Sequence, residues 1–306
     1  MTSKNTGYEN KLFSKLLIFF GFTMIGMVIG GVIGTMAMLL ITKSDPIVFQ
    51  KYFEDLMINP QNYDNSWNAL MAMQWFSALF AFVVSPIIFW KYIEKQSLRS
   101  FTQDHVNHNL LWLLVPILVI AIMPLNEWIN ALNKQIPLPE SLKWMIEKED
   151  AAAKLTHFLV NFKSIEEFII GLIVIAGLAA VGEEITFRGV LQNLILKSTQ
   201  NHHIAIWASA IIFSAIHVQF LGFFPRMLLG ALFGYLYFWS NNLWIPILAH
   251  FINNGFVLLM SYLYQNKTIQ TNPDDIQIDT IQAMISALLS STIIYLIYKK
   301  NKSLIY

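Results

Sequence analysis

Long apolar runs, each close to the thickness of a lipid bilayer when coiled into a helix, recur along the 306-residue chain. A helix needs roughly 20 apolar residues to cross a hydrocarbon core about 30 Å thick. We therefore predict an all-α, polytopic transmembrane helical bundle of about eight spans, forming one integral membrane domain over residues 1–306. The eight predicted spans are 16–41, 68–92, 110–131, 167–187, 204–221, 225–240, 244–264 and 280–298.

The composition agrees with a membrane protein and excludes several other classes. Hydrophobic residues make up 56% of the chain and charged residues only 13%, with a mean hydropathy of +0.52, whereas soluble domains carry about 25% charged residues. The net charge of +1 gives no electrostatic basis for binding nucleic acid. The absence of cysteine excludes disulfides, thiolate metal sites and a cysteine nucleophile.

Lysine and arginine gather in alternate loops, which predicts the orientation of the chain in the membrane. The basic side, which we expect to be cytoplasmic, contains both termini. Its charges are Lys4, Lys11, Lys15, Lys95, Arg99, Lys197, Lys299, Lys300 and Lys302. On the opposite side, the long stretch 132–163 combines helical apolar spacing with many charges, so we expect a helix that lies on the outer surface.

Three charged residues interrupt the apolar segment 169–196, namely Glu183, Glu184 and Arg188. A charge near the centre of a spanning helix costs about 2.5–3.5 kcal/mol on insertion scales, so three exposed to lipid would cost roughly 8–10 kcal/mol. These side chains must therefore face protein or a water-filled cavity.

The spacing of these charges assigns them different roles. Glu184 and Arg188 are four residues apart on one helical face and can form an ion pair. Glu183 points about 100° away and has no partner on its own helix. An unpaired carboxylate in an apolar surrounding is typical of a general acid or base. The alternatives are that the pair only locks helices together, or that the whole segment lies at the membrane interface.

Two further apolar segments carry isolated polar side chains. His217 follows Phe213 by one turn in 204–221, and His250 and Asn254 share a helical face in 244–264. A lone membrane histidine is often a hydrogen-bonding group of the core, and such a pair can also hold helices together. Taken together, however, these residues and the glutamates predict one polar pocket built from three helices, because intramembrane ionisable groups commonly mark functional sites.

The polar residues of these three segments form three sequence motifs. Residues 183–189 read Glu-Glu-Ile-Thr-Phe-Arg-Gly, and the pairs Phe213/His217 and His250/Asn254 follow in order. This series resembles the CAAX-protease and bacteriocin-processing family, which are intramembrane endopeptidases related to the CAAX prenyl proteases. The resemblance covers a motif-bearing core of about residues 165–260. It implies a cavity open towards the cytosol and the bilayer, and hydrolysis of peptide bonds by water.

The resemblance also implies roles for individual residues. Glu183 would activate water, and the two histidines with Asn254 would position that water, bind a metal or stabilise the oxyanion. The catalytic set carried over from the family is Glu183, Glu184, His217, His250 and Asn254, with Arg188 and Phe213 in support. Zinc is a possible cofactor, with Glu183, His217 and His250 as its ligands. The enzyme would then be of the metallo type, and otherwise of the glutamate type.

The same resemblance implies a bilayer-embedded protein of the plasma membrane of a prokaryote, acting on a peptide, a prenylated peptide or a membrane protein. Two other functions compete with this one. A non-catalytic immunity or membrane-regulatory protein of the same fold would not need the intact motifs. A transporter that uses Glu183 in a proton relay is disfavoured because the chain shows no internal repeat.

Overall fold

The computed structural model describes residues 5–45, 49–102, 109–137 and 139–301, which leaves the predicted cytoplasmic charges Lys4 and Lys302 outside the described residues. No strand occurs in this part of the chain, and the all-helical prediction is confirmed. Its α-helices are α1 (Asn5–Thr42), α2 (Phe49–Ile58), α3 (Ser66–Ala78), α4 (Ser85–Ile88), α5 (Asn109–Asn133), α6 (Lys143–Leu159), α7 (Ile165–Gly171), α8 (Ala179–Glu184), α9 (Asn193–Thr199), α10 (His202–Ala215), α11 (Phe223–Ser240), α12 (Trp244–Gln265) and α13 (Thr280–Asn301).

Two of the long helices are continuous only because wider, π-helical turns join their α-helical parts. The π segment Leu79–Val84 links α3 to α4, while Leu172–Leu178 and Ile185–Gln192 link α7, α8 and α9. Such turns shift the regular hydrogen-bond ladder and are frequent near functional sites. A side chain of one π segment contacts the backbone of another, because the hydroxyl of Thr186 donates to the carbonyl of Phe82 at 2.9 Å.

Six helices of the described chain are long and apolar enough to cross a membrane: 12–42, 66–93, 110–134, 165–199, 244–265 and 280–301. The other two predicted spans, 204–221 and 225–240, correspond to α10 and α11. With 14 residues, α10 is about 21 Å long, which is less than the hydrocarbon core. The prediction for 204–221 was too long because the helix ends at Ala215 and the chain turns, with Val218 in the left-handed region at φ 52°.

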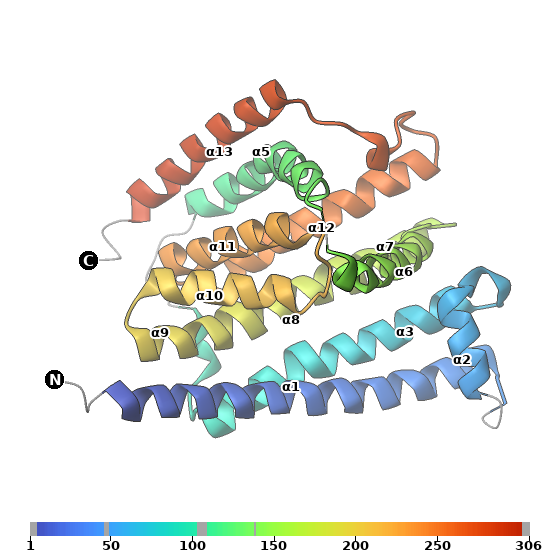
Figure 1. Ribbon diagram of the computed structural model, residues 1–306, viewed down its shortest axis with the longest axis horizontal. Coiled ribbons are helices and arrows are strands. Elements are labelled where there is room, and N and C mark those ends of the chain that lie inside the picture. The colour runs from blue at the N-terminus through green and yellow to red at the C-terminus, as the bar shows by residue number, and fades with distance from the viewer. Residues whose placement is uncertain (1–4, 46–48, 103–108, 138, 302–306) are drawn as a thin grey trace.

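The helices form three layers (Figure 1). α1 and α3 make one outer layer, α5 and α13 make the opposite one, and the continuous helix 165–199 lies between them with α10, α11 and α12. The start of α1 and the end of α13 lie at the same end of the bundle. That this end of the bundle faces the cytoplasm stays a prediction.

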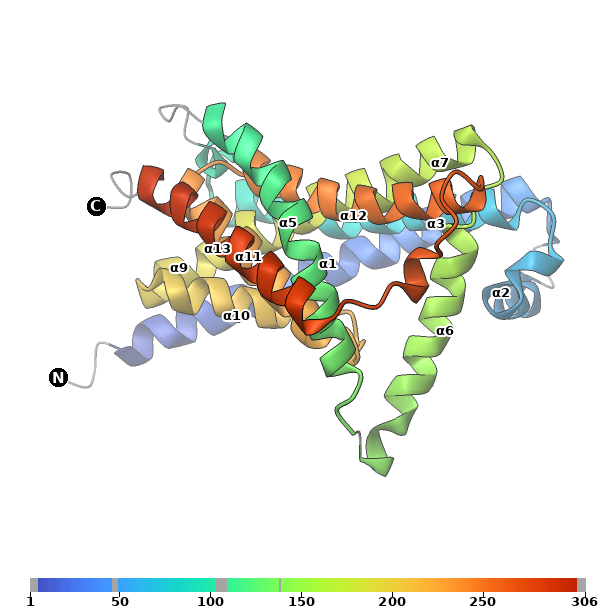
Figure 2. The same ribbon diagram turned by 90° about the horizontal axis from the view of Figure 1, so that it is seen from above.

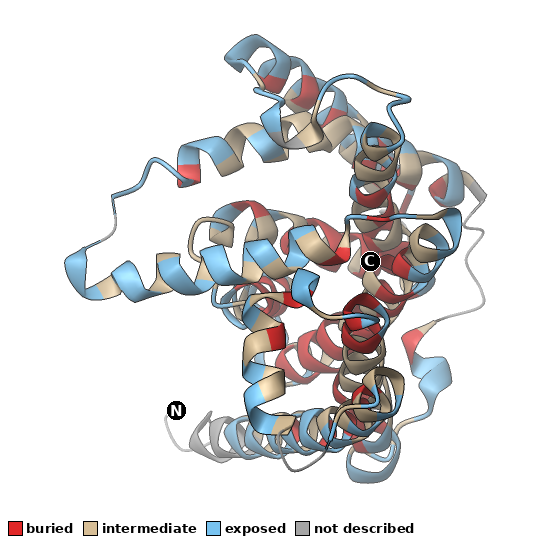
Figure 3. Cartoon of the chain, turned by 90° about the vertical axis from the view of Figure 1, so that its right-hand side faces the viewer, coloured by how far each residue is buried: buried red, intermediate tan, exposed pale blue. Residues whose placement is uncertain are grey.

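The outside of the bundle is apolar, as a lipid-facing surface requires. Buried residues gather along the inner helices, while much of the periphery is exposed (Figure 3). Large apolar side chains are exposed along both outer layers, among them Leu40 on α1 and Leu288 on α13. The predicted helix within 132–163 is present as α6, which is mostly exposed and runs obliquely away from the bundle (Figure 2).

Closely spaced glycines bring α1 against α3 and its π-helical continuation. Gly26, Gly30 and Gly34 recur every fourth residue, as in helix pairs that pack with their backbones in near contact. A Cβ atom on Gly34 would lie 2.9 Å from the Cα of Met73, and one on Gly30 would lie 2.9 Å from the Cα of Ser77. The small residues therefore fix how closely the two helices approach.

We predict that Gly30→Leu destabilises the bundle by about 1–3 kcal/mol or more, because the new side chain overpacks a contact made by backbone. Thermal unfolding of the detergent-solubilised protein, followed by tryptophan fluorescence, measures the effect. The matched control is Gly31→Leu, since a Cβ atom there meets nothing within 4 Å. Equal losses of stability in both variants would contradict this account of the packing.

Candidate active site

A fully buried ion pair lies at the centre of the motif-bearing helix. Glu184 ends α8, and its Oε1 accepts a hydrogen bond from Nη1 of Arg188 at 2.8 Å, as the spacing of four residues predicts. The two side chains are 0% and 1% exposed. The second arm of the guanidinium donates to the carbonyl of Gly230 on α11 at 2.6 Å. The pair therefore also joins the motif helix to α11.

Aromatic rings enclose this guanidinium. The Cζ atom of Arg188 lies 5.1 Å from the ring centre of Phe213 and 5.7 Å from that of Phe233. A cation over an aromatic face is attracted by the ring quadrupole, most strongly when water is excluded. Phe213 thus stabilises the charge of Arg188, which is a physical basis for the supporting role expected of both residues.

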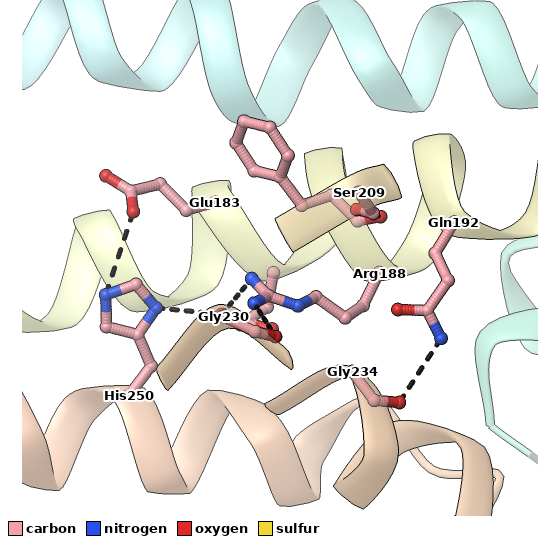
Figure 4. Close-up of polar contacts among 9 residues, drawn as sticks. Glu183, Arg188, Gln192, Ser209, Gly230, Gly234 and His250 are labelled. Atoms are coloured by element: carbon pink, nitrogen blue, oxygen red, sulfur yellow. Dashed lines mark hydrogen bonds and ion pairs between the residues drawn. The ribbon is translucent and has the colours of Figure 1, made fainter. Parts of the chain in front are cut away.

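His250 of α12 connects the two glutamates, and Figure 4 shows its ring facing Glu183. Its Nδ1 lies 2.8 Å from Oε1 of Glu184, and its Nε2 lies 3.7 Å from Oε2 of Glu183. Because a carboxylate only accepts hydrogen bonds, the short contact assigns a proton to Nδ1. The other nitrogen then faces Glu183 at a distance beyond a direct hydrogen bond, with its lone pair available to a small molecule between them.

The sequence predicted that His217 lies within the spanning helix 204–221. In the structure it lies in a turn after α10. It follows the end of α10 by two residues, and its Nδ1 donates to the carbonyl of Phe213 at 2.8 Å. Its ring also packs against the ring of Phe213, with the centres 5.1 Å apart. Both imidazoles are therefore held at Nδ1, and within the described residues neither Nε2 makes a hydrogen bond to a protein group.

One cavity of about 320 Å³ gathers most of the predicted site residues. Glu183, with 17% of its side chain exposed, contributes its carboxylate to the wall. The full lining consists of Asn126, Glu127, Asn130, Glu183, Phe213, His217, Gly222, Pro225, Arg226, Leu229, Phe233, His250, Asn253 and Asn254. Glu184 and Arg188 are not part of this wall but lie buried behind His250.

The sequence reasoning missed several residues of this wall. Asn126, Glu127 and Asn130 come from α5, in the half of the chain without a motif, and Arg226 comes from the first turn of α11. Each is a polar residue in or beside an apolar run, which is the same signal that identified the glutamates. Asn253, which precedes Asn254 on α12, also lines the cavity and its Nδ2 donates to Asn254 Oδ1 at 3.1 Å.

The polar side of α5 begins directly after two hydrogen bonds between the backbone of that helix and Ser286 of α13. The hydroxyl of Ser286 on α13 accepts a hydrogen bond from the backbone N–H of Leu125 at 3.1 Å and donates to the carbonyl of Ala121 at 2.5 Å. It stands between two backbone groups that would pair with each other in a regular helix, directly after Pro124. The inserted hydroxyl keeps both groups satisfied inside the membrane domain.

The arrangement of these donors does not fit the expected zinc site. Within the described ranges, no group of three histidine, aspartate or glutamate side chains converges closely enough to hold a metal ion. Glu183 and His250 are near neighbours, but no third ligand joins them. No role in the reaction is therefore assigned to zinc.

Comparison with known proteins agrees with the motifs. Residues 165–256 match the family described as type II CAAX prenyl endopeptidase Rce1-like. Two proteins of Bacillus subtilis (strain 168) are similar in sequence. The first, "Uncharacterized protein YpbD", is 38% identical over 79 residues, which are 24% of this chain and 37% of the relative, so the match spans little more than a third of that protein.

The second relative is named "Putative membrane peptidase YdiL". It is 23% identical over 194 residues, which cover 61% of this chain and 73% of the relative. No solved structure matches the chain. The region that matches the family, residues 165–256, contains all three motifs and therefore every cavity side chain that the motifs supply. The chain is an integral membrane protein, and its residues 165–256, which contain the three motifs, are similar to the type II CAAX prenyl endopeptidase Rce1-like family.

Proposed function

We propose that the protein is an intramembrane endopeptidase that hydrolyses peptide bonds of membrane-associated, prenylated or other peptide substrates. The observation that carries the proposal is the position of Glu183. Its carboxylate lines a polar cavity and faces the Nε2 of His250 at 3.7 Å, while the other nitrogen of that imidazole is held by Glu184. A carboxylate beside an oriented imidazole is suited to binding and deprotonating water.

The proposed reaction needs no nucleophile from the protein. A water molecule between Glu183 and His250 donates a hydrogen bond to each. As Glu183 takes one proton, the water oxygen attacks the carbonyl carbon of the scissile bond, and a tetrahedral oxyanion forms. Glu183 then gives this proton to the amide nitrogen, the C–N bond breaks, and the products are a carboxylic acid and an amine.

Two cavity residues are suited to assist this reaction. The amide group of Asn254 has donor hydrogens in the cavity wall, and such donors stabilise an oxyanion when they are fixed before the reaction. The Nε2 of His217 faces the same space because its Nδ1 is held by the carbonyl of Phe213. We assign His217 to holding the water or the leaving amine.

Glu184 has a different role in this proposal, although the family resemblance placed it among the catalytic residues. Its side chain is fully buried and does not line the cavity, so it cannot touch a substrate there. It acts as a positioning residue, since its carboxylate fixes the tautomer and orientation of His250 and is itself held by Arg188.

We also propose a location in the plasma membrane of a prokaryote, with both termini in the cytoplasm. The excess of lysine and arginine near the termini and in the loop 93–109 supports this orientation. The placement of the start of α1 and the end of α13 at one end of the bundle is compatible with it.

The first prediction of this proposal concerns Glu183. Glu183→Gln removes the proton acceptor but keeps the shape of the side chain, so we expect kcat to fall by about 10²–10⁴-fold with thermal stability retained. Cleavage of a fluorogenic peptide library by the purified protein in liposomes measures this. Glu147→Gln on the exposed helix α6 is the matched control and should retain activity.

Persistence of a cellular phenotype in the Glu183→Gln protein would instead support the non-catalytic immunity or regulatory alternative. In that case the wild-type protein should cleave no member of the library.

A second prediction separates catalytic support from simple locking of helices. Glu184→Gln leaves Arg188 buried without its counter-ion, which should destabilise the protein by about 3–5 kcal/mol. The double variant Glu184→Gln with Arg188→Met removes both charges and should recover much of that stability. Peptidase activity should stay low in both, because His250 has lost its carboxylate partner. If activity recovered together with stability in unfolding and cleavage assays, the pair would be purely structural.

A third prediction concerns metal removal. Because no three donors converge, we expect cleavage to persist after dialysis against a strong chelator. Rates measured along a chelator titration, with total metal determined on the same sample, test this. Loss of activity that returns with added zinc would instead show that Glu183, His217 and His250 rearrange to hold the ion.

A further inference from the structure

The turn at residues 216–222, which joins α10 to α11, carries His217 to the wall of the cavity. Directly after this histidine, Val218 adopts φ 52°, which lies in the left-handed region. A β-branched side chain crowds the backbone there and is rarely found in that region. Such a conformation persists only where the surrounding structure determines it. The shape of the turn therefore depends on contacts from outside it.

Asn133, the last residue of α5, supplies two of these contacts. Its Nδ2 donates to the carbonyl of Phe220 at 2.8 Å and to the carbonyl of Leu221 at 2.6 Å. The side chain is only 2% exposed, so the bonds are shielded from water. Its Oδ1 has no hydrogen-bond partner within the described part of the chain. The contribution of this amide therefore lies in the two bonds to the turn.

Glu149 of α6 holds the same part of the turn from another element. Its Oε2 accepts a hydrogen bond from the backbone N–H of Leu221 at 3.0 Å. Both backbone polar groups of Leu221 are thus bound by side chains, as is needed where no regular helix pairs them. Asn133 and Glu149 both precede residues 165–256, which contain the motifs. The turn that carries a motif residue is therefore held from outside the motif region.

The two ends of the turn are fixed differently. The hydroxyl of Ser214, which is 0% exposed, donates to the carbonyl of Phe223 at 2.7 Å and so joins α10 to the start of α11. The ring of His217 is held at Nδ1 by the carbonyl of Phe213. These contacts remain when Asn133 is replaced. Loss of its amide would therefore release the middle of the turn and leave the flanking helices joined.

We propose that Asn133 is a positioning residue of the site that acts through His217. By binding two carbonyls of the turn, it holds the backbone next to Val218 in its strained shape and keeps the imidazole of His217 in the cavity. Without it, the turn relaxes to other conformations, and the imidazole moves relative to Glu183 and His250. A displacement of about 1 Å can lower a rate by about 100-fold. This proposal rests on the peptidase function proposed above.

The first test measures cleavage kinetics in liposomes. Asn133→Leu removes both donors at a similar side-chain volume, so we expect kcat and kcat/KM to fall together by about 10- to 100-fold. Glu149→Leu should lower them in the same way, whereas Glu149→Gln keeps an acceptor oxygen and should retain most of the rate. If Asn133→Leu does not fold, Asn133→Ala replaces it in each measurement.

The matched control for stability is Gly30→Leu, which should weaken the bundle far from the turn and keep the wild-type kcat at temperatures below its unfolding transition. A loss of kcat in Gly30→Leu as large as that in Asn133→Leu would overturn the proposal, because both effects would then follow from reduced stability.

A double-mutant cycle separates an effect through His217 from a general structural effect. In a His217→Ala background, Asn133→Leu should lower kcat no further, because the imidazole that it positions is absent. Loss by the same factor in both backgrounds would overturn the proposal. Val218→Gly gives a second measure, since glycine adopts positive φ without strain and should restore part of kcat to Asn133→Leu. Where His217→Ala leaves no measurable rate, this restoration decides, and its absence overturns the proposal.

Hydrogen exchange of backbone amides tests the hold on the turn without any cleavage. In the full-length Asn133→Leu protein, exchange over residues 216–222 should become faster while exchange over α12 stays unchanged. Unchanged exchange in the turn would overturn the role of Asn133. If exchange in the turn becomes faster but the wild-type protein cleaves no peptide, the proposed hydrolysis alone fails.

Discussion

The buried ion pair between Glu184 and Arg188 is the constraint on which the site depends. Two charges inside a membrane domain are tolerated only where each has a partner and excellent geometry. Here the guanidinium is satisfied by a carboxylate, a backbone carbonyl on α11 and two aromatic rings. Because these contacts come from three elements, the guanidinium is fully satisfied only when the motif helix, α10 and α11 are assembled. The fold and the site therefore stabilise each other.

The adjacent residues Glu183 and Glu184 lie in different surroundings, and the proposed mechanism gives them different roles. Glu184 points into the protein and fixes His250, whereas Glu183 points into the cavity and faces the free nitrogen of the same ring. The change from α-helix to π-helix begins directly after Glu184. Asn193 compensates for the altered ladder by donating to the carbonyls of Arg188 and Gly189. The wider turn thus occurs beside the two glutamates, and the amide of Asn193 satisfies two of its backbone carbonyls.

The features of the fold and the site that depend on local residue spacing could be predicted from the sequence. Those that depend on long-range packing could not. The Glu184–Arg188 pair followed from a separation of four residues, and the helical class followed from the apolar runs. The end of α10 before His217 was not predictable, because an apolar sequence reads the same whether it continues as helix or turns. The hydrogen bond of His250 with Glu184 joins residues 66 positions apart, and no pattern along one helix reports such a distance.

The wall of the cavity also depends on the half of the chain that lacks motifs. The family match covers only residues 165–256, yet α5, which lies outside it, supplies Asn126, Glu127 and Asn130 to the same cavity. The proposed hydrolysis requires water at Glu183 inside a domain whose outside is apolar, and the polar side chains in the cavity wall stabilise such water. α5 does not carry the proposed chemistry, but it completes the polar surface around it. In the proposed mechanism the motif helices therefore contain the reacting groups, while α5 forms part of the wall around them.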